Sequence, residues 1–248
     1  MDKQIYKNIQ TAIKNQQRLL AILLDPDKLS IADVSEVTNK INASIATHIF
    51  VGGSTVDDNR TEALLIELRK HTDLPLLVFP GDTNQISNEA DGLLFLSLIS
   101  GRNPDYLIGK QVEAVSKLRE SNLEVIPTGY ILIGEENETA VENVSQTKPI
   151  HSEDITTIAD TAKAGEYLGF KLIYLEAGSG ANHSVTFEAI QQVKSDLNIP
   201  LIVGGGIMSK EAFETAHQAG ANMVVIGTAF ENDLEFLDYL ETKYQVEL

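Results

Sequence analysis

The sequence has 248 residues, of which 19 are Lys or Arg and 36 are Asp or Glu, so its formal net charge is −17. Such an acidic chain is a poor partner for nucleic acid, whose phosphates are bound by basic surfaces. The absence of cysteine excludes disulfides and zinc-thiolate sites. No apolar run approaches the roughly 20 residues that span a bilayer, so we expect no stable membrane insertion and a soluble, cytoplasmic protein. We expect a single domain over residues 1–248.

Short, nearly continuous apolar runs recur along the chain, as is typical of parallel strands that are buried on both faces. Polar segments with helical periodicity separate most of them. The predicted strands are Leu19–Leu24, His48–Val51, Leu74–Phe79, Gly92–Leu98, Leu123–Ile126, Leu172–Leu175, Pro200–Val203 and Met223–Ile226. The predicted helices are Ile31–Ile41, Thr61–Arg69, Tyr106–Glu120, Ile155–Leu168, Ser184–Leu197, Lys210–Ala219 and Leu234–Lys243.

Eight strand-and-helix units in one chain of this length favour an α/β protein with a (β/α)₈ barrel, a TIM barrel, over the alternative of a doubly wound open sheet. Two connections depart from the regular pattern. Only ten residues, Asp82 to Asp91, link the third and fourth strands, so the third helix should be missing or vestigial. The polar segment Gly134–Glu153 predicts a long exposed loop, of the kind that often serves as a lid or binding loop.

Glycine clusters follow three neighbouring strands of the predicted barrel, at the end where TIM barrels carry their chemistry. Glycine lets the backbone approach an anion closely, and such loops frequently bind phosphate through N–H groups. The alternative is that these residues only form tight turns. The clusters are Gly178-Ser179-Gly180, Gly204-Gly205-Gly206 and Gly227-Thr228.

Two oxygen-bearing residues follow the first two strands. Asp25 ends an apolar strand, where an unpaired buried carboxylate would be costly, and Ser54 follows the neighbouring strand. A carboxylate and a hydroxyl suit Mg²⁺, which keeps several ligands from water or substrate. The alternative for Asp25 is a solvated loop residue. Asp27 and Lys28 are expected to be local caps or charge partners.

Glu176 lies at the end of the sixth apolar run, on the same face as Tyr174 by the period of two. A carboxyl near a low-dielectric barrel rim has a raised pKa and is suited to act as a general base. The alternative is a structural Glu bonded to neighbouring backbone. Tyr174 and Tyr130, the latter expected just past the fifth strand, are candidates to contact phosphate or line a pocket.

These blocks resemble the geranylgeranylglyceryl phosphate synthase family from about Leu19 to Phe230. The heptaprenyl-using branch of this family has Tyr-Leu-Glu-Tyr-Ser-Gly after the sixth strand. Here Ala177 to Gly180 replaces that run, which favours the geranylgeranyl-using branch. The blocks that carry the resemblance are Leu24–Lys28, Val51–Thr55, Ser100–Gly109, Pro127–Leu132, Tyr174–Ala181, Val203–Ile207 and Ile226–Ala229.

The resemblance implies a Mg²⁺-dependent prenyltransferase on a modified TIM barrel. It would join a polyprenyl diphosphate to the 3-hydroxyl of sn-glycerol 1-phosphate as an ether and release diphosphate. By the family's motifs, Asp25 and Ser54 hold the metal. We expect Glu176 and Tyr174 to be catalytic, with Glu176 taking the proton of the hydroxyl. The residues implied to hold the acceptor phosphate are Tyr174, Leu175, Glu176, Ala177, Gly178, Ser179, Gly180, Gly205, Gly206, Gly227 and Thr228.

Other functions remain open from the residues. A phosphate-binding-barrel isomerase, aldolase or lyase acting on a small phosphorylated metabolite would use the same glycines without a metal or an apolar groove. A Schiff-base aldolase would need a Lys within a strand, and only Lys171 lies near one, at its start. A non-catalytic phosphometabolite-binding subunit would not need Glu176. We expect a homo-oligomer, because barrels often pack through their outer helices.

Overall fold

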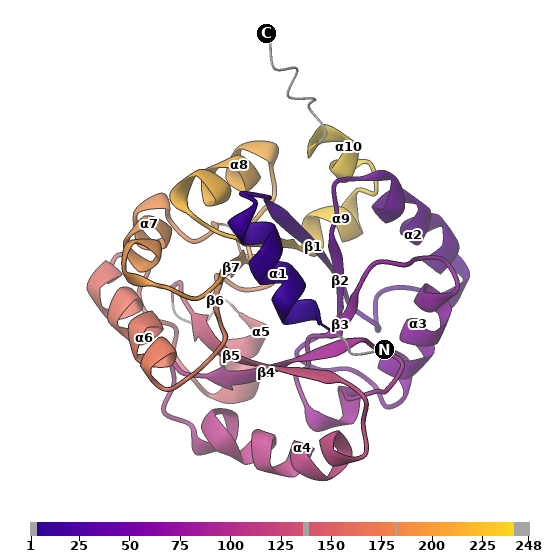
Figure 1. Ribbon diagram of the computed structural model, residues 1–248, viewed down its shortest axis with the longest axis horizontal. Coiled ribbons are helices and arrows are strands. Elements are labelled where there is room, and N and C mark those ends of the chain that lie inside the picture. The colour runs from indigo at the N-terminus through magenta and orange to yellow at the C-terminus, as the bar shows by residue number, and fades with distance from the viewer. Residues whose placement is uncertain (1–3, 136–138, 182, 241–248) are drawn as a thin grey trace, which may run out of the picture.

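The computed structural model describes residues 4–135, 139–181 and 183–240. Eight parallel strands pair in chain order, and β1 pairs with β8 to close the barrel (Figure 1). The predicted TIM barrel is confirmed, and the open sheet is excluded. The strands are β1 Leu19–Leu24, β2 His48–Val51, β3 Leu76–Val78, β4 Gly92–Leu98, β5 Glu124–Leu132, β6 Leu172–Glu176, β7 Leu201–Gly204 and β8 Met223–Ile226.

The strands are largely apolar because most positions on both of their faces are buried. In β6, Ile173 and Leu175 face the core between the barrel and its helices, whereas Leu172 and Tyr174 face the barrel lumen. This alternation follows from the period of two in a strand. The two hydrophobic layers explain why largely apolar runs form a closed sheet.

Helices surround the barrel within the described ranges. Several begin at a capping side chain: the Ser209 hydroxyl accepts a hydrogen bond from the N–H of Ala212, three residues on. The helices are α1 Ile5–Lys14, α2 Val34–Ala43, α3 Arg60–Arg69, α4 Lys110–Arg119, α5 Ala140–Ser145, α6 Ile155–Tyr167, α7 Phe187–Asp196, α8 Lys210–Ala219, α9 Thr228–Asn232 and α10 Phe236–Leu240. The last predicted helix extends to Lys243, and residues 241–243 lie outside the described residues.

The connection between β3 and β4 contains one short 3-10 turn, η2 (Thr83–Gln85), where a regular barrel has a helix. The next helix begins irregularly, because a π-helical turn, η3 (Asp105–Gly109), precedes α4. Together these features leave room beside β4 that an ordinary third helix would fill.

Two expectations about the fifth unit were wrong. β5 continues to Leu132, so the segment Pro127–Tyr130 lies within the strand and Tyr130 is in the lumen rather than past the strand end. The segment Gly134–Glu153 is not simply an exposed loop. It contains α5, and Glu142 and Ser145 in that helix are buried. Tertiary packing buries polar residues whose sequence pattern indicates exposure.

The N-terminal helix α1 lies across one end of the barrel (Figure 1). Its Ile5 and Ile9 are buried in the lumen core, and the Glu124 carboxylate accepts hydrogen bonds from the N–H groups of Ile5 at 2.5 Å and Tyr6 at 3.0 Å. A carboxylate at a helix N-terminus is favourable because it meets unpaired N–H groups. This end of the barrel is therefore closed, and ligands must reach the opposite end.

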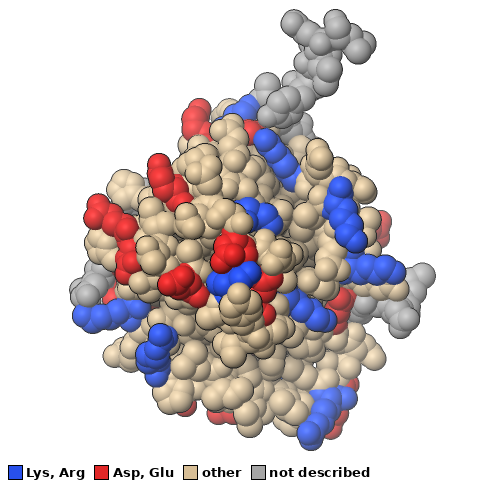
Figure 2. Space-filling view, turned by 60° about the vertical axis from the view of Figure 1, so that its left-hand side comes forward, with Lys and Arg blue, Asp and Glu red and all other residues tan. Residues whose placement is uncertain are grey.

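The surface carries the excess of acidic residues without separating the two signs of charge on the face drawn in Figure 2, where Lys and Arg lie among Asp and Glu. In the described part of the chain, no helix is long and apolar enough to cross a membrane.

Candidate active site

The predicted site residues come together at the carboxyl ends of the strands. Asp25 follows β1, Ser54 follows β2, and Glu176 is the last residue of β6. Gly205 follows β7 and Gly227 follows β8. Because parallel strands end on the same rim, the closed barrel gathers these distant segments into one region.

Glu176 is a buried carboxyl at this rim, only 5% exposed. One of its oxygens, Oε1, accepts a hydrogen bond of 2.7 Å from the Gly178 N–H. Burial raises the pKa of Glu176 to about 7, while the Gly178 N–H and the nearby phenols of Tyr174 and Tyr130 act in the opposite direction. The carboxyl can therefore exchange a proton near neutral pH, as a general base or acid must.

Tyr174 lies deeper than the sequence suggested. Its side chain has no exposed surface, and its hydroxyl has no hydrogen-bond partner among the described residues. A Cβ at Gly204 would lie 2.2 Å from this hydroxyl, so glycine is required there for packing against Tyr174. Burial raises the pKa of the Tyr174 phenol well above its usual value, so it stays protonated. Its position beneath the rim places it next to Glu176 rather than on an open surface.

The glycine loops after β6 and β7 meet at Glu176. Gly178, Gly205 and Gly206 have φ values of +105°, +80° and +66°, which L side chains rarely adopt. A Cβ at Gly205 would lie 2.4 Å from Glu176 Oε1 and 2.5 Å from the Gly178 nitrogen. The loops approach each other this closely only because Gly205 has no side chain.

The loop after β6 also reaches the loop after β8, since the hydroxyls of Ser179 and Thr228 are 3.3 Å apart. Thr228 is the first residue of α9, which begins beside Gly227. Leu175 contributes differently from the rest of this motif, because its side chain packs into the outer core. Ala177 is bonded into the barrel rim through its N–H, which donates to the Gly204 carbonyl at 3.0 Å.

Asp25 is half-buried, and its carboxylate oxygens can bind a further ligand besides their contacts with Asp27 and Lys28. Its Oδ1 accepts a hydrogen bond of 3.0 Å from the Asp27 N–H, and the Lys28 ammonium lies 3.8 Å from Oδ2. Its neighbours also form shorter ion pairs with other residues: Asp27 lies 3.4 Å from Arg60, and Lys28 lies 2.8 Å from Glu231. This confirms the expectation that Asp27 and Lys28 are local charge partners.

The donor set at Asp25 and Ser54 consists of hard oxygens, the type that Mg²⁺ prefers. The described ranges contain no group of three or more His, Cys, Asp or Glu side chains that could hold a metal. A metal bound here would thus need water or substrate oxygens for its remaining positions, which is the usual state of Mg²⁺ in proteins. The residues present fit such an ion.

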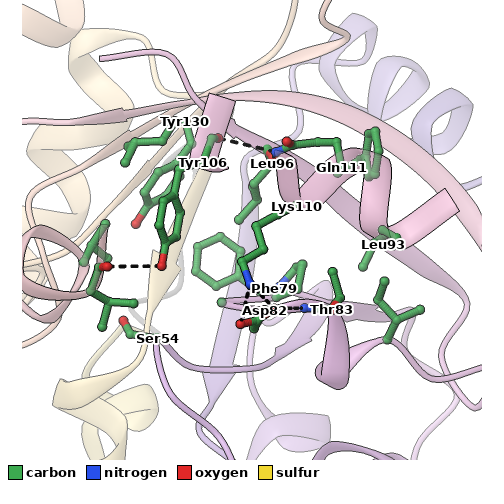
Figure 3. A pocket seen from close by; sticks show the side chains of 18 of the residues that line it. Ser54, Phe79, Asp82, Thr83, Leu93, Leu96, Tyr106, Lys110, Gln111 and Tyr130 are labelled. Atoms are coloured by element: carbon green, nitrogen blue, oxygen red, sulfur yellow. Dashed lines mark hydrogen bonds and ion pairs between the residues drawn. The ribbon is translucent and has the colours of Figure 1, made fainter. Parts of the chain in front are cut away.

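An apolar cavity opens beside these groups, in the space left by the short β3–β4 connection (Figure 3). An ion pair crosses its lining, with the Lys110 ammonium 3.0 and 2.9 Å from the two carboxylate oxygens of Asp82. The pair joins α4 to the turn after β3. Residues that line the cavity include Gly53, Ser54, Phe79, Asp82, Ile86, Leu93, Phe95, Leu96, Tyr106, Lys110, Gln111, Ala114, Tyr130, Val141 and Val144.

Residues 12–244 match the model of the PcrB family. The chain belongs to the PcrB family. One relative is geranylgeranylglyceryl phosphate synthase of Flavobacterium johnsoniae, 55% identical over 94% of this chain and 96% of that protein. A second, from Zunongwangia profunda and of the same name, is 51% identical over 89% of this chain and 94% of that protein.

Solved structures agree with this family assignment. The crystal structure of (S)-3-O-geranylgeranylglyceryl phosphate synthase from Thermoplasma acidophilum, in complex with its substrate sn-glycerol-1-phosphate, has a TM-score of 0.89. It is 31% identical to this chain and covers 95% of each chain. The resemblance found in the motifs is thus confirmed over nearly the whole PcrB-family chain.

Sequence reasoning missed most of the residues that line the cavity of this PcrB-family protein. Phe79, Leu93 and Ala114 carry no chemical motif, and their apolar character predicts only burial. The one usable signal was the ten-residue connection from Asp82 to Asp91, which implied empty space without showing what surrounds it.

Proposed function

We propose that this protein is a prenyltransferase that joins a polyprenyl diphosphate, geranylgeranyl in this branch, to the 3-hydroxyl of sn-glycerol 1-phosphate. The reaction forms an ether and releases diphosphate. The observation that carries the proposal is the arrangement at Glu176, a buried carboxyl with a raised pKa that lies between glycine loops and shares its end of the barrel with an apolar cavity. The names of the relatives support the same substrates.

The glycine loops would bind the acceptor's phosphate. Gly178, Gly205 and Gly206 bring backbone close together at the rim, and such loops offer N–H groups to anions. The Ser179 and Thr228 hydroxyls add donors from two sides. Holding the phosphate fixes the acceptor's free hydroxyl in one place, which removes much of the entropic cost of reaction.

Glu176 would take the proton of that hydroxyl. Oε1 is held by the Gly178 N–H, so the carboxyl is oriented by the same loop that would hold the acceptor. A base with a pKa of about 7 is mostly deprotonated just above neutral pH and still binds a proton strongly enough to remove it from an alcohol as the ether bond forms.

Asp25 and Ser54 would hold Mg²⁺ beside the diphosphate. When bound, the ion supplies a Lewis acid that neutralises charge on the leaving group. Asp27 is the natural control, because it follows the same strand yet pairs with Arg60. Asp25→Asn should lose most turnover and regain part of it at higher Mg²⁺ concentration, whereas Asp27→Asn should change turnover little. Full activity of Asp25→Asn in the presence of a chelator would refute this role.

The apolar cavity would hold the prenyl chain. A phosphosugar isomerase or aldolase has no use for such a space, so the cavity favours the prenyltransferase over that alternative. Ser54 lines the cavity, which places the proposed metal site at one part of its wall.

The decisive experiment is incubation of the purified protein with geranylgeranyl diphosphate, sn-glycerol 1-phosphate and Mg²⁺, followed by mass spectrometry of the lipid extract. We expect the ether of the two substrates and one diphosphate per ether. The enantiomer sn-glycerol 3-phosphate is the matched control and should react poorly. Absence of the ether, with diphosphate released by water alone, would overturn the proposal.

We also propose that the protein works in the cytoplasm as a homo-oligomer. Tyr167 and Leu168, at the end of α6, are 80% and 75% exposed, and adjacent exposed apolar side chains often mark interfaces. Light scattering should give a multiple of the chain mass, and Tyr167→Asp with Leu168→Asp should lower it. A monomer at working concentrations would refute the oligomer.

A further inference from the structure

Four aromatic rings fill the rim end of the barrel lumen, and Phe79 connects them. Its ring centroid lies 5.3 Å from that of Tyr174, 5.9 Å from that of Tyr130 and 6.3 Å from that of Phe50. Tyr174 and Phe50 have no exposed surface, whereas Phe79 is half-buried and lines the apolar cavity. Phe79 and Tyr130 are therefore the two members of the cluster that line the cavity, and Phe79 is the more exposed of the two.

Phe79 also lies between the two polar parts of the site. Two residues further along, a Cβ at Gly81 would lie 2.6 Å from the Ser54 carbonyl oxygen, so the turn after β3 packs on the loop that carries Ser54. On the other side, Phe79 packs on Tyr174 and Tyr130, whose hydroxyls lie near the Glu176 carboxyl. Figure 3 shows Phe79 beside Lys110 and Asp82 in the cavity lining.

We propose that the ring of Phe79, backed by Tyr130 and Tyr174, stabilises the positive charge that develops on the allylic carbons of the donor during transfer. The proposal rests on the proposed function, because it concerns the donor's reacting end. As the C1–O bond breaks, its electron pair leaves with the diphosphate. A lone pair of the acceptor oxygen then forms the new C1–O bond, and the proton of that hydroxyl passes to Glu176.

An aromatic face suits this task for two reasons. The ring's negative quadrupole attracts a cation, and the attraction is stronger where water is excluded, as on the wall of this cavity. The ring also has no lone pair with which to capture the cation, whereas a carboxylate or hydroxyl in its place would trap it. Stacking on Tyr174 at an interplanar angle of 29° holds the Phe79 ring in one orientation.

The test replaces Phe79 with phenylalanines that carry one, two and three fluorine atoms, which weaken the ring's quadrupole in steps while keeping its shape. The single-turnover rate of ether formation should fall at each step, and the trifluoro variant should be slower by roughly 3- to 30-fold, the range expected of a desolvated cation–π contact. Affinity for the donor, measured with a non-reactive diphosphate analogue, should stay within about twofold.

A matched control separates this role from packing. Phe50 belongs to the ring cluster without lining the cavity. Fluorination of Phe50 should leave the rate unchanged. An unchanged rate in the Phe79 series with an active parent enzyme would overturn the inference alone. Equal losses at Phe50 and Phe79 would also overturn it, because they would point to packing. A parent enzyme that makes no ether would refute the proposed function, and the inference with it.

Discussion

Two neighbouring parts of the rim differ in what shapes them. One part is the set of glycine loops after β6, β7 and β8, and the other is the cavity beside β4. The loops are short, local in sequence and shaped by backbone, with positive φ at Gly178, Gly205 and Gly206. The cavity is shaped by side chains from β4, α4, α5 and the connections after β2 and β3. A small anion can be bound by a few backbone N–H groups, whereas a long apolar chain needs a wall assembled from many segments.

Glu176 lies between the glycine loops and near Tyr130, which lines the cavity, so its replacement should have the largest effect. Glu176→Gln keeps the side chain's shape and removes the base, and loss of a general base typically slows turnover by about 10²–10⁴-fold. Single-turnover kinetics and the melting temperature should be measured on the same variant.

The matched control for this prediction is Glu124→Gln, at the closed end of the barrel, where the carboxylate accepts hydrogen bonds from α1. That variant should lose stability and keep its rate. If Glu176→Gln instead stayed active and melted earlier, Glu176 would be a structural residue.

Gly205→Val should weaken binding of the acceptor and leave binding of the donor unchanged. A side chain there would meet Glu176 Oε1 at 2.4 Å and would force a β-branched residue into a left-handed backbone, so affinity for sn-glycerol 1-phosphate should fall by roughly 10-fold or more. Calorimetry with each substrate separately tests this.

The control is Gly169→Val, at a glycine with φ +94° where an added Cβ would have no atom within 4 Å, so it carries the same backbone strain away from the site. Equal weakening of acceptor binding in both variants would show that strain, and not the site, is responsible.

The pH dependence tests the buried carboxyl directly. With a pKa of about 7, Glu176 becomes protonated as the pH falls below 7, so the single-turnover rate should drop about 10-fold per pH unit there.

Stability should change in the opposite sense. The pKa of Glu176 is higher in the folded protein than its ordinary value of 4.5, so the folded state binds the proton more tightly and this group's favourable contribution is lost as the pH rises from about 4.5 through 7. Denaturation of Glu176→Gln should lack this component. A rate that is flat between pH 5 and 8 would contradict the assignment.

Ala114→Phe should give the smallest effect of these variants. It should weaken binding of the donor alone, whereas Gly205→Val should weaken binding of the acceptor alone. Ala114 lines the cavity from α4, and a phenyl ring there would occupy space that the donor chain needs. We expect a cost of about 1–1.4 kcal/mol, at the low end of what overpacking typically causes, so donor affinity should fall by roughly 5- to 10-fold. Binding of sn-glycerol 1-phosphate should not change, and loss of both ligands would mean that the two parts are not separable.

Much of this protein was determined by local sequence. The eight apolar runs specify strands buried on two faces, and their order with intervening helices leads to a parallel barrel. Once the barrel is assumed, residues such as Asp25, Glu176 and Gly205 must fall at the same rim, because parallel strands end together. These features were predictable since each depends on residues close in the chain and on a general rule of topology.

Other features were decided only by tertiary structure. Burial raises the pKa of Glu176 to about 7, and burial depends on atoms from several strands. The depth of Tyr174, the buried polar residues of α5 and the placement of α1 across the barrel likewise depend on what packs against them. The cavity is the clearest case. The short connection after β3 implied a missing helix, but the walls of the cavity come from residues whose only local property is that they are apolar. The shape of the cavity arises from contacts between distant segments rather than from any single segment.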